Sequence, residues 1–151
     1  MKLRSAKDIR TKFYEGKWRC HREIKLAQEQ LGDEIIFEAL YGVFIDPDID
    51  EEQFEIQHQA GHCLLKLLPK CKGNLVELIK DSLLVWNRSV EELPWYFFKQ
   101  FGKKDILVAI EEIEHNYKLK DSENKKLRTY KYWLCADDEY LNSTIEAKYK
   151  I

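Results

Sequence analysis

Two histidines four residues apart, His58 and His62, have the spacing at which a helix presents a pair of imidazoles to a zinc ion. Metalloproteases of that type need a glutamate directly after the first histidine, and this position holds Gln59. Cys63 is adjacent, but consecutive helical side chains point about 100° apart and cannot easily share one ion with both histidines. We therefore expect packing or surface histidines and no metal site.

Three aspartates at alternate positions, Asp46, Asp48 and Asp50, imitate the start of a calcium-binding loop. The loop pattern requires glycine where Glu51 stands and glutamate where Gln57 stands. The chain also has no G-x-S-x-G nucleophile motif and no phosphate-binding glycine-rich loop, and it contains only 6 glycines from which to build one. We expect no catalytic residue, no cofactor and no enzymatic activity.

Charge is unevenly distributed along the chain. Residues 1–30 carry nine Lys/Arg and four Asp/Glu, whereas residues 31–65 carry nine Asp/Glu and no Lys or Arg. The acidic stretch is either a solvated turn with acids near a helix start or a docking surface for a basic partner, such as a nuclease domain that itself attracts phosphates. If it is a docking surface, the residues expected to steer and bind the partner are Asp46, Asp48, Asp50, Glu51, Glu52 and Glu55.

Helical periodicity runs through the sequence, and alternation of period two does not persist anywhere. It predicts a polar first helix over residues 5–30, which Gly16 could break, and a short final helix. Between them it predicts three helix pairs, at 33–45 with 51–68, 74–86 with 90–101 and 105–118 with 122–136. No pair can bury its apolar face alone, but three stacked pairs can. The predicted fold is all-α: a single domain over residues 1–151, built as a small α-solenoid of three helical hairpins with an N-terminal capping helix.

The central stretch, residues 72–102, is predicted to be the most apolar hairpin, with a break of only three residues at 87–89. Asn74 stands at an N-cap position and Gly102 at a C-cap position. Ser89 and Glu92 match a capping box that would start the second helix at Val90, and Pro94 would then kink it. The alternative is a helix that begins at Pro94; we favour the kink.

Composition sets the wider expectations. With 44% hydrophobic and 13% aromatic residues the chain can build a packed core, and a net charge of −2 creates no global field toward nucleic acid or membrane. We therefore expect neither as a partner. The first residues contain no apolar signal segment, and the four cysteines form no C-x-x-C pair. We expect reduced core thiols and a cytoplasmic location.

Residues 83–133 also carry a family resemblance. The residues concerned are Trp86, Glu91, Glu92, Gly102, Asp105, Ala109, Lys131 and Trp133. This arrangement resembles small bacterial HEAT-repeat-like helical proteins, among them immunity proteins of contact-dependent growth inhibition systems, over a third to a half of the chain. The resemblance implies a cytosolic inhibitor that binds one cognate toxin domain and occludes its active site. The acidic stretch would suit immunity to a nuclease, such as an EndoU-like RNase that cleaves tRNA. The alternatives are a HEAT-like protein-binding adaptor and a HEAT-like DNA glycosylase, which would require a basic stripe.

Overall fold

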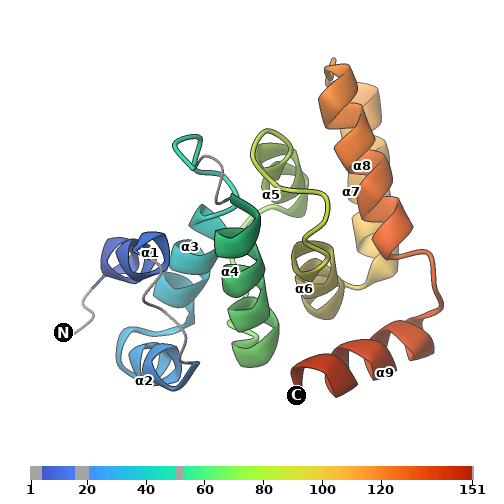
Figure 1. Ribbon diagram of the computed structural model, residues 1–151. Helices are drawn as coiled ribbons and strands as arrows, with labels where there is room; N and C mark the ends of the chain where they lie inside the picture. The colour runs from blue at the N-terminus through green and yellow to red at the C-terminus, as the bar shows by residue number, and fades with distance from the viewer. Residues whose placement is uncertain (1–4, 16–20, 50–52, 151) are drawn as a thin grey trace.

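The computed structural model describes residues 5–15, 21–49 and 53–150 of the 151-residue chain and shows, within them, nine α-helices and no β-strand (Figure 1). The helices are α1 Ala6–Tyr14, α2 His21–Leu31, α3 Asp33–Gly42, α4 Gln53–Leu67, α5 Leu75–Ser82, α6 Glu92–Phe101, α7 Lys103–Asn116, α8 Asp121–Trp133 and α9 Asp138–Tyr149. They stack in chain order from α1 and α2 at one end to α7 and α8 at the other (Figure 1). The all-α, solenoid-like class predicted from the sequence is confirmed.

The N-terminal region contains two helices, α1 and α2, in place of the single helix predicted over residues 5–30. Gly16, where the sequence allowed a break, lies outside the described residues. Ser5 caps helix α1, and its Oγ accepts a hydrogen bond from the Asp8 amide at 3.3 Å. It buries Ile9 and Phe13, while α2 buries Ile24 and Ala27. Both helices pack against α3. Two short helices can each turn a thin apolar stripe toward the same neighbour, which one straight rod could not do.

The centre of the chain also differs from the predicted hairpin. Helix α5 ends at Ser82, so nine residues, 83–91, connect it to α6 instead of three. One bond within this segment and one from α4 hold it. Buried Trp86 donates from Nε1 to the Val90 carbonyl at 3.0 Å, and the side chain of buried Gln57 of α4 donates to the Val85 carbonyl at 3.0 Å. The side-chain oxygen Oε1 of Gln57 also accepts from the Asn87 backbone amide at 2.7 Å.

Helix α6 begins at Glu92, and Pro94 lies in its first turn, where the missing N–H costs no helical hydrogen bond. The predicted start at Val90 with a kink at Pro94 is therefore wrong. The backbone of α5 packs against α7 and that of α6 against α4 and α7, more closely than α5 and α6 approach each other. The central pair is not a self-contained hairpin.

Several predicted helix ends are confirmed. Asn74 caps α5, its Oδ1 accepting from the Glu77 amide at 3.2 Å. Gly102 joins α6 to α7 with a backbone φ of 85°, which glycine adopts without strain. The predicted short final helix is α9, which returns to pack against α4 (Figure 1).

One continuous core links these helices, and aromatic rings form its centre. Phe37 and Tyr41 of α3 stack at 5.2 Å, and Phe37 stacks on Tyr96 of α6 at 5.9 Å. Trp86 packs on Tyr130 of α8 at 4.4 Å. The phenol oxygens find partners too, since Tyr96 donates to the Pro69 carbonyl at 2.5 Å. A buried tyrosine therefore fills space in the core with its ring and fixes the relative position of two elements through the hydrogen bond of its hydroxyl.

The cysteines divide between core and surface. Of the predicted core thiols in the described residues, Cys63 is buried, Cys71 is half-buried and Cys135 is exposed, so that prediction is wrong for Cys135. Cys20 lies outside the described residues. In the described part of the chain, no helix is both long enough and apolar enough to cross a bilayer.

Candidate functional site

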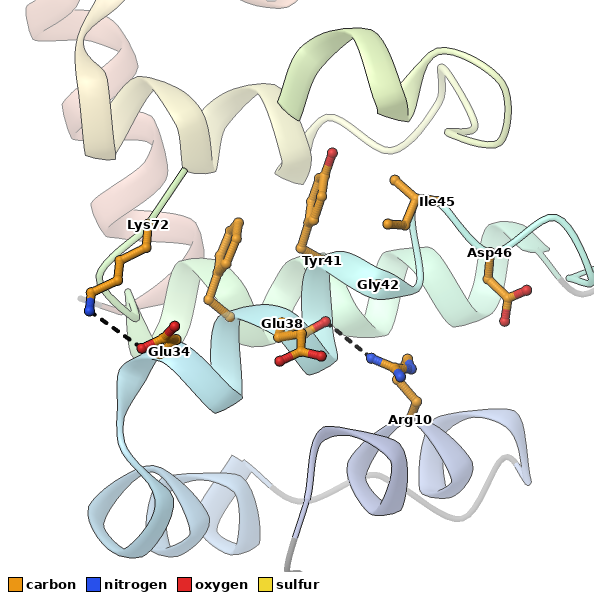
Figure 2. A pocket seen from close by; sticks show the side chains of 9 residues that line it. Arg10, Glu34, Glu38, Tyr41, Gly42, Ile45, Asp46 and Lys72 are labelled. Carbon is orange, nitrogen blue, oxygen red and sulfur yellow. Dashed lines mark hydrogen bonds and ion pairs between the residues drawn. The ribbon is translucent and has the colours of Figure 1, made fainter. Parts of the chain in front are cut away.

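A groove beside α1 and α3 encloses a volume of about 500 Å³ and carries a mixture of carboxylates and aromatic surface (Figure 2). Phe37, Tyr41 and the 39% exposed Ile45 supply its apolar lining. Its other residues are Arg10, Glu34, Glu38, Gly42, Asp46 and Lys72. Helix α3 alone supplies five of the nine lining residues, because positions three and four apart lie on one helical face. We call this hollow the acidic groove.

The charges of the acidic groove are only partly compensated inside the protein. Lys72 pairs with Glu34 at 3.4 Å, and Arg10 donates to the backbone carbonyl of Glu38 at 3.3 Å. The Glu38 carboxylate is exposed and forms no ion pair with a described residue. Three carboxylates against two cations leave the rim negative, and Glu38 is the charge that a partner can reach without breaking an internal bond.

Asp46, a predicted docking residue, is held in place at the rim. Its Oδ2 accepts a hydrogen bond from the Tyr14 phenol at 2.7 Å, and its Oδ1 accepts from the Asp48 amide at 2.9 Å. Burial of the ring, followed by the bond to Asp46, raises the pKa of Tyr14. The Tyr14 phenol therefore stays protonated and donates, which fixes the Asp46 charge between α1 and the turn after α3.

The remaining predicted docking residues are spread along the surface. Asp48 and Glu55 are exposed, and Glu55 lies in the first turn of α4 beside the 43% exposed Phe54. Asp50, Glu51 and Glu52 lie outside the described residues. Of the six predicted docking residues, the structure brings Asp46 into the acidic groove.

Glu34 and Glu38 were missed as site residues, although both belong to the acidic stretch. The signal was available: they are four residues apart, so they share one face of the helix predicted at 33–45. Asp33, by contrast, has an internal role, since Gln28 donates to its Oδ1 at 2.9 Å and the Lys70 amide to its Oδ2 at 2.8 Å. Acids next to each other in sequence thus divide between surface charge and structural support.

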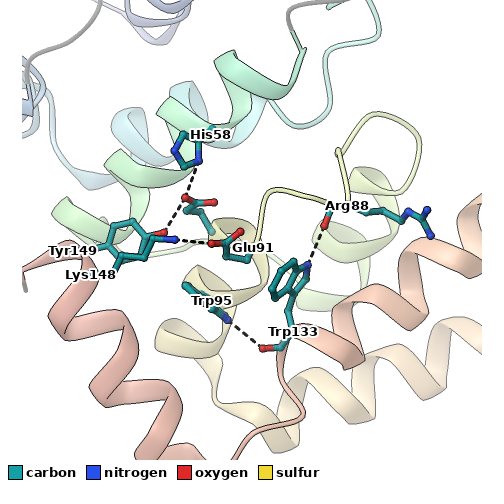
Figure 3. Close-up of polar contacts among 8 residues, drawn as sticks. His58, Arg88, Glu91, Trp95, Trp133, Lys148 and Tyr149 are labelled. Carbon is teal, nitrogen blue, oxygen red and sulfur yellow. Dashed lines mark hydrogen bonds and ion pairs between the residues drawn. The ribbon is translucent and has the colours of Figure 1, made fainter.

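A second constellation lies where α4, α6 and α9 meet (Figure 3). Glu92 is fully buried; its Oε2 accepts from the Tyr149 phenol at 2.8 Å and faces His58 Nδ1 at 2.9 Å. Its Oε1 has no hydrogen-bond partner among the described residues. Burial raises the pKa of Glu92 against the opposing effect of the Tyr149 hydrogen bond. We call these residues, with Glu91 and Lys148, the buried junction.

The buried junction fastens the last helix to the stack. Lys148 of α9 forms an ion pair with Glu91 at 2.7 Å (Figure 3), and the ring of Tyr149 meets His62 edge-on at 5.0 Å. A carboxyl, an imidazole and a phenol together could transfer protons. Glu92 and Tyr149 are 0% and 1% exposed, so an incoming molecule could reach only His58, whose side chain is 39% exposed. The geometry supports a fastening role.

The two candidate metal motifs have other structural roles. His58 stacks on Phe54 at 5.7 Å and faces Glu92, and His62 packs on Tyr149. The Oδ1 of Asp46 accepts a hydrogen bond from the Asp48 backbone amide. Among the described residues, no group of three or more histidine, cysteine, aspartate or glutamate side chains is placed to hold a metal ion.

Comparison with protein families, with curated proteins and with solved structures finds no match for this chain. The class of protein is therefore defined by the fold and the surface themselves. It is a small, all-α, solenoid-like protein with a partly uncompensated acidic groove at its N-terminal end.

Proposed function

We propose that this protein is a binding protein that docks a basic partner in the acidic groove, and that the partner is a cognate toxin domain with nuclease activity. One observation carries the proposal: the groove combines an apolar lining, in which Ile45 is exposed and Phe37 and Tyr41 are each 6% exposed, with a rim on which the Glu38 carboxylate is exposed and unpaired. Apolar anchors inside a charged rim are the usual anatomy of a protein interface.

Charge complementarity selects the kind of partner. A nuclease domain presents a positive surface to attract phosphates, and an acidic rim steers such a surface into place while repelling acidic proteins. The exposed carboxylates of Asp48 and Glu55 extend the negative surface beyond the groove. Asp50, Glu51 and Glu52 are assigned to the same docking set from the sequence.

The mechanism we propose is occlusion, in the cytoplasm, by a surface that is already formed. The Tyr14–Asp46 hydrogen bond holds Asp46 in place before the partner arrives, so little side-chain entropy is lost at that position on binding. No residue of this protein need act on the toxin chemically. The resemblance to immunity proteins described above points to the same role.

The test titrates the product of the gene immediately upstream with this protein, in a nuclease assay and by calorimetry. We expect stoichiometric inhibition and binding that weakens as salt is raised. Glu38→Lys should reduce the association rate and weaken the affinity by roughly fivefold, the effect of about 1 kcal/mol for an exposed charge. Glu112→Lys, an exposed site on α7 without an ion-pair partner in the described residues, is the matched control and should bind like the wild type.

Other outcomes would contradict parts of the proposal. Inhibition that is equally strong in Glu38→Lys and insensitive to salt would move the interface away from the groove. No binding, together with the absence of any toxin gene nearby, would reject the immunity role and favour the protein-binding adaptor.

A further inference from the structure

A second hollow, of about 440 Å³, lies on the opposite end of the stack, between α8 and the segment 83–91. Its lining residues are Arg88, Lys125, Arg128, Thr129 and Tyr132. The four from α8 share one helical face, since they are spaced three and four residues apart. Every one of the five side chains can donate a hydrogen bond, and none is aliphatic or acidic. We call this surface the basic hollow.

The positive charges of the basic hollow are not neutralised by the protein. Arg88, Lys125 and Arg128 form no ion pair within the described part of the chain, whereas nearby Lys131 is paired with Glu114 at 2.7 Å. Lys126 donates to the Leu84 carbonyl at 3.0 Å. Burial, followed by the nearby charge of Arg88, lowers the pKa of Lys126.

The hollow is also held in a fixed shape. Trp133 of α8 donates from Nε1 to the Arg88 carbonyl at 2.9 Å, which ties the segment 83–91 to α8 (Figure 3). The Tyr132 ring packs edge-on against Trp133 at 5.1 Å and remains 65% exposed. A large exposed aromatic ring thus stands beside three unpaired cations.

We propose that the basic hollow binds single-stranded nucleic acid, with Arg88, Lys125 and Arg128 on successive phosphates and the Tyr132 ring stacked on a base. Sequence-tolerant single-strand binding uses this combination of a cationic track and an aromatic platform. An acidic protein segment fits less well, because the hollow offers no aliphatic surface for its apolar side chains. This proposal is independent of the acidic groove.

The proposal departs from the expectation, based on the net charge of −2, that nucleic acid is not a partner. The net charge sums an acidic region at one end of the molecule with a basic region at the other. Residues 118–133 contain six Lys/Arg and two Asp/Glu, and the fold adds Arg88 from a distant part of the sequence. The local field of the basic hollow, rather than the net charge, governs binding at this end.

The test is fluorescence anisotropy of the full chain with a labelled 12-nucleotide RNA of mixed sequence at several salt concentrations. Three phosphate contacts predict a slope of log affinity against log salt of about −2. Arg128→Glu should weaken binding and make that slope shallower by roughly 0.7 to 1. Tyr132→Ala should lower the affinity by roughly 5- to 150-fold through lost stacking.

Arg22→Glu is the matched control, because it makes the same charge change at an exposed helical position at the other end of the molecule. It should bind as the wild type does. Equal losses in Arg22→Glu and Arg128→Glu, or no binding at 20 μM protein in low salt, would overturn the proposal. A 12-residue polyglutamate that competes as strongly as the RNA would overturn it in favour of an acidic protein partner.

Discussion

Glu92 at the buried junction and Glu38 on the rim of the acidic groove are the same side chain in opposite surroundings. Glu92 is fully buried, touches α4 and α9, and leaves one oxygen without a partner. Glu38 is exposed, and only its backbone carbonyl is used internally. The comparison shows that burial, not residue type, decides whether a carboxylate holds the fold together or remains available to a partner.

The largest effect should come from removing the tyrosine that closes the buried junction. Tyr149→Ala deletes a buried aromatic ring and the hydrogen bond to Glu92, so we expect the free energy of unfolding to fall by about 3–5 kcal/mol. Tyr140→Ala, on the same helix but 63% exposed, should change it by less than about 0.5 kcal/mol. Urea unfolding followed by circular dichroism measures both. Similar losses in the two variants would show that α9 is not fastened through Tyr149.

A smaller loss of stability is expected when a glycine is replaced by alanine at the buried junction, compared with the same replacement at the acidic groove. A Cβ at Gly61 of α4 would lie 2.5 Å from the Glu92 Cβ, so Gly61→Ala must push α4 and α6 apart. We expect a loss of about 1–3 kcal/mol, reduced by the higher helix propensity of alanine.

Gly42→Ala, at the acidic groove, is the matched comparison. Its Cβ would meet Arg10 Nη1 at 2.8 Å, at the far end of a flexible side chain that can move aside. Stability should therefore stay level or rise. Thermal unfolding of both variants checks this, and a loss at Gly42→Ala as large as at Gly61→Ala would mean that the groove is packed as rigidly as the junction.

The smallest effect should be a change in the pH dependence of stability. Because the pKa of Glu92 is raised in the folded protein, the folded state holds its proton more tightly than the unfolded state, whose glutamate pKa is about 4.3. The stability that protonated Glu92 contributes is fully present below about pH 4.3, the pKa in the unfolded state. It is lost as the pH rises through the raised pKa of the folded state, by up to about 1.4 kcal/mol per pH unit. Glu92→Gln should flatten this decline.

Glu38→Gln provides the surface comparison for the same measurement. Its carboxylate is exposed and has no ion pair in the described residues, so the pH profile should match that of the wild type. Unfolding by urea at a series of pH values between 4 and 8 compares the three proteins. A Glu92→Gln profile identical to the wild type would contradict a raised Glu92 pKa.

Sequence periodicity predicted most of the helices, and where it failed the cause was tertiary. The amphipathic pattern located α3, α4, α7 and α8 to within a few residues. It extended the helix at 74–86 too far, because Trp86 continues the apolar spacing although the backbone has left the helix. No local signal shows that Gln57, 28 residues before Val85, will donate to the Val85 carbonyl and hold the segment there.

The candidate surfaces follow the same division. The acidic stretch is visible in the sequence, but the contrast between Asp33 and Asp46, held by internal hydrogen bonds, and Glu38, left exposed, depends on partners 28 to 37 residues away. The basic hollow was not predicted at all. Four of its five lining residues lie within residues 125–132 of α8, and the fifth, Arg88, is held there through the bond from the Trp133 indole to its backbone carbonyl.

The sequence by itself determined the all-α class, the helix ends at Asn74 and Gly102, and the separation of acidic from basic segments. These are local properties, set by side-chain spacing, backbone conformation and composition. Only the tertiary structure decided which acids are buried, which cations meet, and how the last helix closes on the first half of the chain. Those outcomes depend on burial and on hydrogen bonds between distant residues, whose strength is set by the environment that folding creates.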